Sequence, residues 1–439
     1  MKMRKPIVGL LAATALCSVA FSPIASAQSL QELKTQIDQL SKKLEELEKK
    51  AAAESKKSPD LKVKWKGAPE LSSADGKFKM KIRGRIFTDY ANISVKNSAG
   101  NSLGGEAVDA TEFRTARLGV EGIVFNNVKY KFEADLTGGA SEIKDAYFQW
   151  KLKPISITVG QFKTPNSLEE ETSGRYITFM ERGSFTDAFS LSRQIGIAVG
   201  YAANDVTFKA GIFQGNFANT NAQQDRTYAA RVTYGPKLNE GNIRLHVGAS
   251  VRYRELSDGE GARYRQRPQS HLAANRYISA DFRGTDVGDA ESDTFWGLEA
   301  AGIMGPFSLQ SEYAVLSVNR IGMDQNASLS GGYISASYFI TGESRSYKKG
   351  KIGRTKVKSP VSEGGMGAWQ LAVRYDTIEL NDVDEAVMGG KQNTMIFGVN
   401  WHLNNYARVM ANYSLSDITN DPGGVTDVNA FALRFQVDW

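Results

Sequence analysis

Five basic side chains occupy every second position near residue 80: Lys77, Lys79, Lys81, Arg83 and Arg85. The positions between them are mainly apolar. Because successive side chains of a β-strand point to opposite faces, this segment as a strand has one cationic and one apolar face. Arginine and lysine bind carboxylates and phosphates through charge-assisted hydrogen bonds, so such a row suits anion binding. An edge strand of a soluble sheet also carries lysines on its wet face, and this segment alone leaves both interpretations open.

Hydrolytic chemistry has little support in the sequence. The only histidines are His246, His271 and His402, and no serine lies in a recognisable nucleophile elbow or triad context. The only cysteine, Cys17, falls within the predicted signal peptide described below, which excludes a disulfide or a cysteine-based metal site in the mature chain. No cluster of ligands indicates a metal or an organic cofactor. We therefore predict that the protein is not an enzyme and has no cofactor.

Sixteen segments with strand-like alternation follow one another from residue 77 onward, and each has the length of a tilted membrane strand. They lie near residues 77–90, 112–125, 128–138, 142–152, 154–162, 192–203, 205–213, 225–235, 242–255, 293–303, 306–318, 330–341, 366–379, 393–403, 406–417 and 427–439. Their connections mostly alternate between tight turns and long loops, which is typical of outer-membrane barrels and has no reason in a soluble sandwich. The chain also ends on an apolar face that finishes with Trp439. The sequence therefore predicts an all-β fold, a 16-stranded antiparallel transmembrane β-barrel over residues 77–439.

The first part of the chain has a different composition. Residues 1–27 have a basic head, an apolar centre and an Ala-Ser-Ala cleavage site, which predicts a signal peptide. Residues 28–57 carry apolar side chains at alternating spacings of three and four, which predicts a short coiled-coil helix. Residues 58–76 are rich in Lys, Ser, Ala and Pro and are predicted to be a linker. Removal of the signal peptide leaves a formal charge of about +3, a modest surplus that by itself says little about partners. We predict no nucleic-acid partner.

Several segments together closely resemble the phosphate-selective porin O/P family of Gram-negative outer membranes. These segments are EFRTARLGVEG (112–122), YKFEAD (130–135), KDAYFQW (144–150), GQFKTPNSLEEETSGRYITFMER (160–182), TGESRSY (341–347) and GVNWHLN (398–404). The resemblance covers essentially all of residues 77–439. It implies a homotrimer of barrels, placed in outer-membrane lipid by the barrel insertion machinery, each with an anion-selective pore. It also implies that the loops after the fifth and ninth strands and the basic turn after the twelfth fold into the lumen.

The same resemblance assigns candidate anion-binding residues. Arg263, Arg265 and Arg267 match a ladder segment, and four further arginines lie near it in the sequence: Arg252, Arg254, Arg276 and Arg283. The candidate constriction residues are Arg114, Arg117, Asp145, Lys163, Ser173 and Arg182. One departure bears on the substrate, because the loop carries Glu169, Glu170 and Glu171 beside Lys163. Three carboxylates at a neck would repel a phosphate dianion unless they face the wall or pair with basic side chains.

Two functions stay open at this point. The first is a passive channel that favours phosphate or related small anions through a lumen lined by arginine and lysine. The alternative is a general diffusion porin without phosphate specificity, in which the coiled coil tethers the outer membrane to the cell wall or a periplasmic partner. Many lumen charges could simply form salt bridges that stiffen the wall, so the sequence does not decide between the two.

Overall fold

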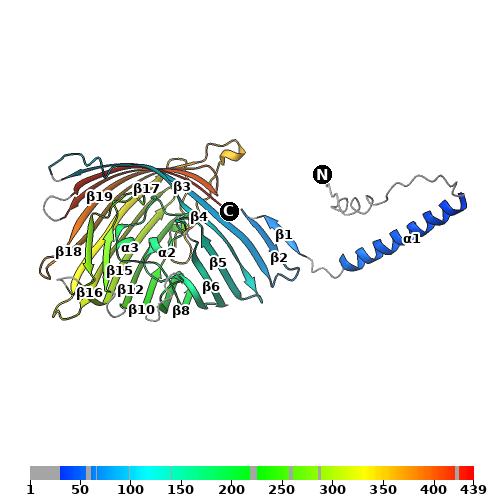
Figure 1. Cartoon of the computed structure of the whole chain (residues 1–439), viewed down its shortest axis with the longest axis horizontal. Helices are drawn as coiled ribbons and strands as arrows, with labels where there is room; N and C mark the ends of the chain where they lie inside the picture. The colour runs from blue at the N-terminus through cyan, green and yellow to red at the C-terminus, as the bar shows by residue number, and fades with distance from the viewer. Residues whose placement is uncertain are drawn as a thin grey trace, which may run out of the picture. The chain divides into compact units, whose positions relative to one another are not determined.

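The structure is a computed structural model that describes residues 30–55, 61–65, 67–97, 99–139, 141–217, 225–256, 261–284, 288–420 and 425–439. The predicted signal peptide lies outside the described residues. The chain divides into two compact units, Met1–Asp60 and Leu61–Trp439, and each is described by itself. Figure 1 shows the elements of both units with their labels.

The first unit contains one described helix, α1 (Leu30–Ser55). Glutamates and lysines separate its apolar side chains, and Leu40, Leu44 and Leu47 are each more than 60% exposed. A helix with such a stripe gains most of its stability by burying the stripe against a partner, so the coiled coil stays a prediction. Among the described residues, no helix is both long enough and apolar enough to span a membrane.

The second unit is built around a closed antiparallel barrel of sixteen strands, counted over the described residues. They are β3 (Lys79–Asn97), β4 (Val108–Val124), β5 (Val128–Asp135), β6 (Glu142–Leu152), β7 (Ile155–Lys163), β8 (Arg193–Ala203), β9 (Val206–Gln214), β10 (Arg226–Tyr234), β12 (Ile243–Glu255), β15 (Ala290–Met304), β16 (Phe307–Arg320), β17 (Ala327–Phe339), β18 (Ala368–Asp382), β19 (Val387–His402), β20 (Ala407–Thr419) and β21 (Val425–Asp438). Each strand pairs with the next, and β21 pairs with β3 to close the wall. The predicted barrel and its strand number are confirmed.

Short strands lie at the rim of the barrel. Within the predicted linker, β1 (Lys62–Trp65) and β2 (Pro69–Ser72) form a hairpin, and β2 pairs with the start of β3. The pairing of β21 with β3 ends at Arg85, so β2 satisfies backbone groups of β3 that β21 does not reach. The two-residue strand β11 (Lys237–Leu238) pairs with β12 beside the 3-10 turn Asn239–Gly241.

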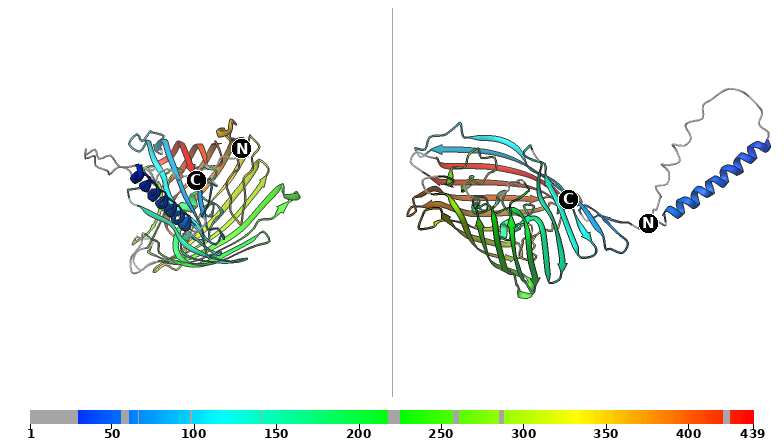
Figure 2. Two further views of the ribbon diagram at one scale, coloured as in Figure 1. Left: turned by 90° about the vertical axis from the view of Figure 1, so that its right-hand side faces the viewer. Right: turned by 60° about the horizontal axis from the view of Figure 1, so that its bottom comes forward.

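Three connections fold against the inner face of the wall, as the resemblance implied, and Figure 2 shows this wall from two further sides. The inward loop (residues 164–192) follows β7 and contains the short helices α2 (Leu168–Glu171) and α3 (Ser184–Ala188). The hairpin loop (residues 261–284) contains β13 (Ala262–Gln266) and β14 (Ile278–Phe282). The basic turn (residues 340–367) follows β17 and contains the 3-10 turn Val361–Glu363.

The two faces of the wall differ in composition. Side chains such as Phe148, Trp150 and Leu298 are more than half exposed on the outer face, whereas Arg374, Arg408 and other polar groups are buried on the inner face. This pattern suits a wall with lipid on one side and polar surroundings on the other. An apolar core also lies inside the barrel, where Phe185 and Phe189 of the inward loop pack against Phe295 of β15 with ring centroids 6.4 Å apart. This core holds the inward loop against the wall.

Candidate functional site

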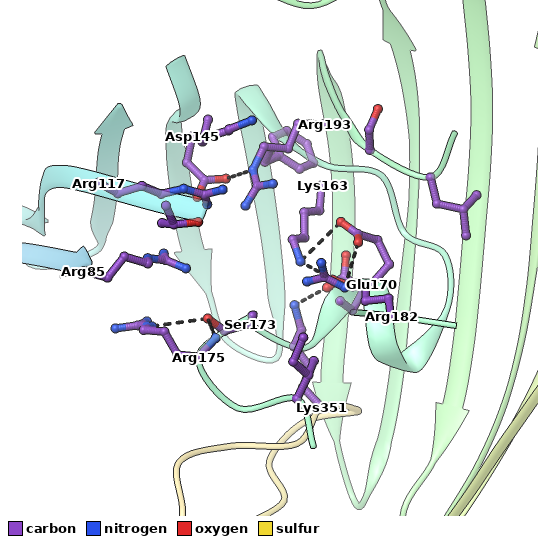
Figure 3. A pocket seen from close by; sticks show the side chains of 18 of the residues that line it. Arg85, Arg117, Asp145, Lys163, Glu170, Ser173, Arg175, Arg182, Arg193 and Lys351 are labelled. Carbon is purple, nitrogen blue, oxygen red and sulfur yellow. Dashed lines mark hydrogen bonds and ion pairs between the residues drawn. The ribbon is translucent and has the colours of Figure 1, made fainter. Parts of the chain in front are cut away.

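A central cavity of about 450 Å³ lies between the inward loop and the wall formed by β3 to β9 and β21. Its lining contains twelve basic and four acidic side chains. The basic side chains are Arg85, Arg114, Arg117, Lys131, Lys144, Lys163, Arg175, Arg182, Arg193, Lys209, Lys351 and Arg434, and the acidic ones are Asp145, Glu170, Glu171 and Glu181. Figure 3 labels ten of the lining side chains, which come from the strands, the inward loop and the basic turn. Basic groups therefore outnumber acidic groups in the lining, and some of them also pair with carboxylates behind it.

Basic groups bind each of the four lining carboxylates. Asp145 lies between Lys131 Nζ at 2.5 Å and Arg193 Nε at 2.9 Å. Arg114 and Arg434 each approach Glu181 to 3.2 Å. Within the described ranges, no group of three or more His, Cys, Asp or Glu side chains could hold a metal ion. The carboxylates therefore position and partly neutralise the lining cations.

Basic side chains pair with the three glutamates of residues 169–171 and offset their negative charge. Glu169 accepts hydrogen bonds from Arg374 at 2.5 Å and from the backbone N–H of Gly183 at 2.7 Å. Glu170 lies 3.1 Å from Arg182 Nε and 3.3 Å from Lys163 Nζ. All three glutamates are buried. The repulsion considered from the sequence is thus relieved, because these carboxylates form ion pairs with basic side chains.

Glu171 provides the third pairing and joins the inward loop to the basic turn. Its carboxylate bonds to Lys351 and lies 3.8 Å from Lys209 Nζ. Burial raises the pKa of the Glu171 carboxyl, but the charges of Lys351, Lys209 and Arg231 outweigh burial and hold its pKa well below the usual range. Glu171 is therefore ionised at neutral pH, and two of its partners line the same cavity.

The predicted ladder arginines gather at two further cavities. A second cavity of about 550 Å³ contains Arg263, Arg265, Arg267 and Arg276 in its lining and shares Arg114 and Arg182 with the central cavity. A third cavity has a volume of about 460 Å³, and the charged side chains that line it are the same four arginines and Glu106. The three cavities therefore share walls in series, from the hairpin loop to the central cavity.

The hairpin of β13 and β14 sets the spacing of the ladder. Arg263 and Arg265 occupy alternate positions of β13, while Tyr264 between them is buried and donates a hydrogen bond to Asp293 at 2.8 Å. Arg276 donates to the backbone carbonyl of Arg265 at 3.2 Å, which brings it to the same cluster. Strand alternation thus directs the arginines toward the cavities and buries the tyrosine.

Some predicted ladder residues lie elsewhere. Arg252 and Arg254 both bind the buried carboxylate of Asp293, at 3.0 and 2.9 Å. Neither lines any of the three cavities, and neither does Arg283, whose guanidinium pairs with Asp281 at 2.7 Å. These arginines lie near the ladder in the sequence. In the structure they bind carboxylates of the barrel wall and of the hairpin loop and do not line the cavities.

The predicted constriction residues do come together. Arg114, Arg117, Asp145, Lys163, Ser173 and Arg182 all line the central cavity. Of the row from Lys77 to Arg85, only Arg85 does so, and it bonds to Glu133 at 2.7 Å. Arg83 bonds to Glu121, while Lys77 lies 3.2 Å from Asp75 in exposed surroundings and Lys79 is also exposed. Lys81 is half-buried at the start of β3.

The candidate site set drawn from the sequence omits several lining cations. Lys144, Arg175, Arg193 and Lys209 line the central cavity but were not among the residues singled out. Strand alternation offered a signal for Lys209, which lies between Phe208 and Ala210 in β9. No comparable signal existed for Arg175, since its position depends on the path of the inward loop.

Interior side chains of the wall hold the inward loop by its backbone. Arg408 donates to the carbonyl of Ile177 at 2.9 Å, and Arg434 donates to that of Met180 at 2.6 Å. Asn400 donates to the carbonyl of Thr178 at 2.9 Å. These bonds satisfy carbonyls that have no partner in regular secondary structure. The loop that narrows the lumen is therefore anchored along its length.

Comparison with known proteins gives consistent matches. The family model described as phosphate-selective porin O and P matches residues 80–439. An uncharacterized protein of Caulobacter vibrioides is 34% identical over 400 residues, covering 87% of this chain and 78% of that protein. Porin O of Pseudomonas aeruginosa is 29% identical over 420 residues, covering 86% and 92% respectively. The structure of in-vitro folded OmpT of Vibrio cholerae in its trimer form matches with a TM-score of 0.51 at 14% identity, covering 82% of this chain and 99% of that one.

Proposed function

We propose that this chain, which belongs to the phosphate-selective porin O and P family, conducts phosphate and related small anions through its three basic cavities. Family membership makes the protein a passive anion channel of the Gram-negative outer membrane and not an enzyme. The finer assignments of substrate and lumen residues are our proposal, and the charge of the central cavity carries them.

The observation that carries the proposal is the ratio of twelve basic to four acidic side chains around the central cavity. A narrow lumen with low-dielectric walls focuses the field of its lining charges, so this excess raises the local concentration of anions. Arginine suits phosphate because its planar fork donates two parallel hydrogen bonds and stays charged at any working pH. The geometry therefore favours anions with several oxygen atoms.

The cavities suggest an order of contacts along the path. Arg263, Arg265, Arg267 and Arg276 would receive the anion at the hairpin loop. Arg114 and Arg182, which line both larger cavities, would pass it to the central cavity. There Arg175 donates to the hydroxyl of Ser173 at 3.2 Å, so both groups face the passing anion.

Release needs contacts of moderate strength, because a single tight site would block conduction. The carboxylates that bind the lining cations weaken the attraction between these cations and a passing anion. Lys131 and Arg193 already bind Asp145, and Lys163 and Arg182 already bind Glu170. An incoming anion therefore exchanges contacts with carboxylates that repel it, and many such sites in series favour passage.

The assembly partners belong to the same proposal. OmpT, whose solved structure resembles this fold, exists in a trimer form. We extend that state to this chain, with outer-membrane lipid around each barrel and the insertion machinery placing it there. The stripe of exposed leucines on α1 supports association of three helices or contact with the cell wall or a periplasmic partner.

Planar bilayers test the anion path. In a potassium chloride gradient, the reversal potential is expected to show anion preference, and phosphate added in low concentration is expected to reduce the chloride current. Arg283→Gln is the matched control, because Arg283 lies outside the three cavities. Cation preference would refute the proposal, and anion preference without phosphate block would identify a general diffusion porin.

A further inference from the structure

A small cavity of about 20 Å³ lies on the short-turn side of the barrel and shares Arg175 and Ile177 with the central cavity. The inward loop contributes Arg175 to its lining, the basic turn contributes Arg345 and Arg354, and the wall contributes His402 and Arg408. Among the described residues, no carboxylate lines it. Four arginines thus meet around a space without a lining counter-charge.

The surroundings provide one carboxylate for these four cations. Asp438 binds Arg354 at 2.7 Å and lies 3.8 Å from Arg175. Arg345 donates to the neutral side chain of Gln310 at 3.1 Å. Arg408 donates to the amide oxygen of Gln436 at 3.0 Å and to loop carbonyls. Within the described ranges, Arg345 and Arg408 form no ion pair.

Arg408 is buried and Arg345 is half-buried, and a cation that lacks a charged partner away from water is costly, so a counter-ion at this place would be stabilising. Burial lowers the pKa of Arg345 to about 10, more than the nearby charge of Glu169 offsets. The buried Nε2 atom of His402 also has no hydrogen-bond partner among the described residues. Arginine N–H groups and a neutral imidazole N–H are all donors, which is the set that an anion requires.

The size of the cavity selects the anion. A cavity needs about 10–15 Å³ of this measure to hold one water molecule, so this one accommodates a single water-sized particle. A halide ion is a single atom of nearly that size and suits this space better than the larger tetrahedral phosphate ion. We propose that this cavity binds a single halide ion, chloride in ordinary media, which neutralises Arg345 and Arg408.

The position of the site gives the ion a structural role. Its ligands come from the inward loop, the basic turn and β20, so one bound ion would connect the loop that narrows the lumen to the turn below it. The occupant would stay in place while the permeating anions pass through the larger cavities, and Arg175 lines both this cavity and the central one.

Bromide provides the direct test, because it replaces chloride and scatters anomalously. Crystals of the full-length protein in bromide are expected to show one anomalous peak between Arg345 and Arg408. In detergent, the melting temperature is expected to rise by a few degrees, saturably, when chloride or bromide replaces gluconate at constant ionic strength. Any rise in phosphate or sulfate comes from the larger cavities and is expected to be the same in Arg345→Gln as in the wild type.

Variants link the effect to the site. Arg345→Gln removes one cation that has only a neutral partner, and it is expected to abolish the halide-dependent rise. Arg283→Gln, outside the cavity, is expected to keep the rise in full. An empty or water-filled cavity in the bromide crystals would overturn the proposal, as would equal melting temperatures in chloride and gluconate. The crystal result does not depend on how well Arg345→Gln folds.

Discussion

Arg182 combines two tasks at the junction of the larger cavities. Its guanidinium donates to the carbonyls of Glu169 and Thr172 at 2.9 and 3.1 Å, and its side chain is still 26% exposed. A side chain that both holds the loop and faces the path couples local structure to conduction. One substitution that removes the positive charge of Arg182, and another that keeps the charge but removes the planar guanidinium, can distinguish the contribution of charge from that of hydrogen-bond geometry.

We expect Arg182→Gln to weaken both the anion preference and the phosphate block, because it removes a charge and a bidentate donor. A hydrogen bond to a charged group contributes about 1.5–3 kcal/mol, so the block constant should rise roughly tenfold or more. Arg182→Lys keeps the charge and should retain the reversal potential while losing part of the phosphate affinity. Reversal potentials and titrated block measure both effects, and equal behaviour of the two variants would contradict this assignment.

The lowered pKa of Glu181 predicts how the stability of the folded protein depends on pH. Burial raises the pKa of its carboxyl, but Arg114 and Arg434 together lower the pKa from 4.5 to about 2. Because the folded-state pKa lies below the ordinary value, the stabilisation is complete above pH 4.5 and is lost as the pH falls toward 2. At about 1.36 kcal/mol per pKa unit the upper limit is about 3 kcal/mol, and partial exposure of the side chain reduces it.

The melting temperature in detergent should therefore fall between pH 5 and 2. Glu181→Gln should start lower and fall less over this interval, because it has no proton to gain. Glu112→Gln is the comparison, since Glu112 is a carboxylate that bonds to His271 at the second cavity and not to Arg114 or Arg434. Parallel curves for wild type and Glu181→Gln would show that another group controls acid stability.

At the scale of elements, the inward loop depends on its anchors in the wall. Asn400 of β19 is buried and donates to the carbonyl of Thr178. We expect Asn400→Ala to loosen the loop locally by about 1–3 kcal/mol, because a buried carbonyl loses its donor, while the barrel stays intact. Faster amide exchange across residues 176–180 and noisier single-channel currents would report the change. Ser416→Ala, which removes only a bond to Thr394 in the same wall, should leave both signals unchanged.

The hairpin loop acts as a unit through its regular arginine spacing. Replacing Arg263, Arg265 and Arg267 together with glutamine should reduce anion conductance more at low salt than at high salt. The Debye length is about 10 Å at 0.1 M salt and becomes shorter as the salt concentration rises. At high salt the electric field of these arginines is therefore already weak. Conductance across a series of chloride concentrations measures this. Equal losses at every concentration would count against a ladder.

At the scale of the whole molecule, conduction and assembly belong to different parts of the chain. The cavities lie within Leu61–Trp439, whereas α1 lies within Met1–Asp60. Removal of residues 28–57 after the signal peptide should leave single-channel conductance unchanged, because the described residues that line the three cavities all belong to the second unit. Native electrophoresis then reports whether the trimer persists, and sedimentation with cell-wall fragments reports whether attachment is lost. A changed conductance would show that the segment contributes to the pore.

The fold could be predicted well because strand period and loop length are local properties. Alternation of two residues, tight turns such as Asn126-Asn127 and the even strand number all appear in the sequence without any contact information. The segment predicted as 142–152 corresponds to β6 at both ends. The pairing of β1 and β2 at the rim was missed, because it depends on how far β21 extends along β3.

The sequence by itself predicted the barrel, and the six residues that the family resemblance assigns to a constriction all line one cavity. Only the tertiary structure decided which charges meet. Arg252 and Arg254 follow the same alternation as lumen-facing residues, yet Asp293 and the backbone of the inward loop bind them. The glutamates 169–171 look repulsive in sequence and are paired in space. Strand alternation tells which side of a wall a charge occupies, but its partner comes from a segment distant in sequence, and long-range packing alone sets that distance.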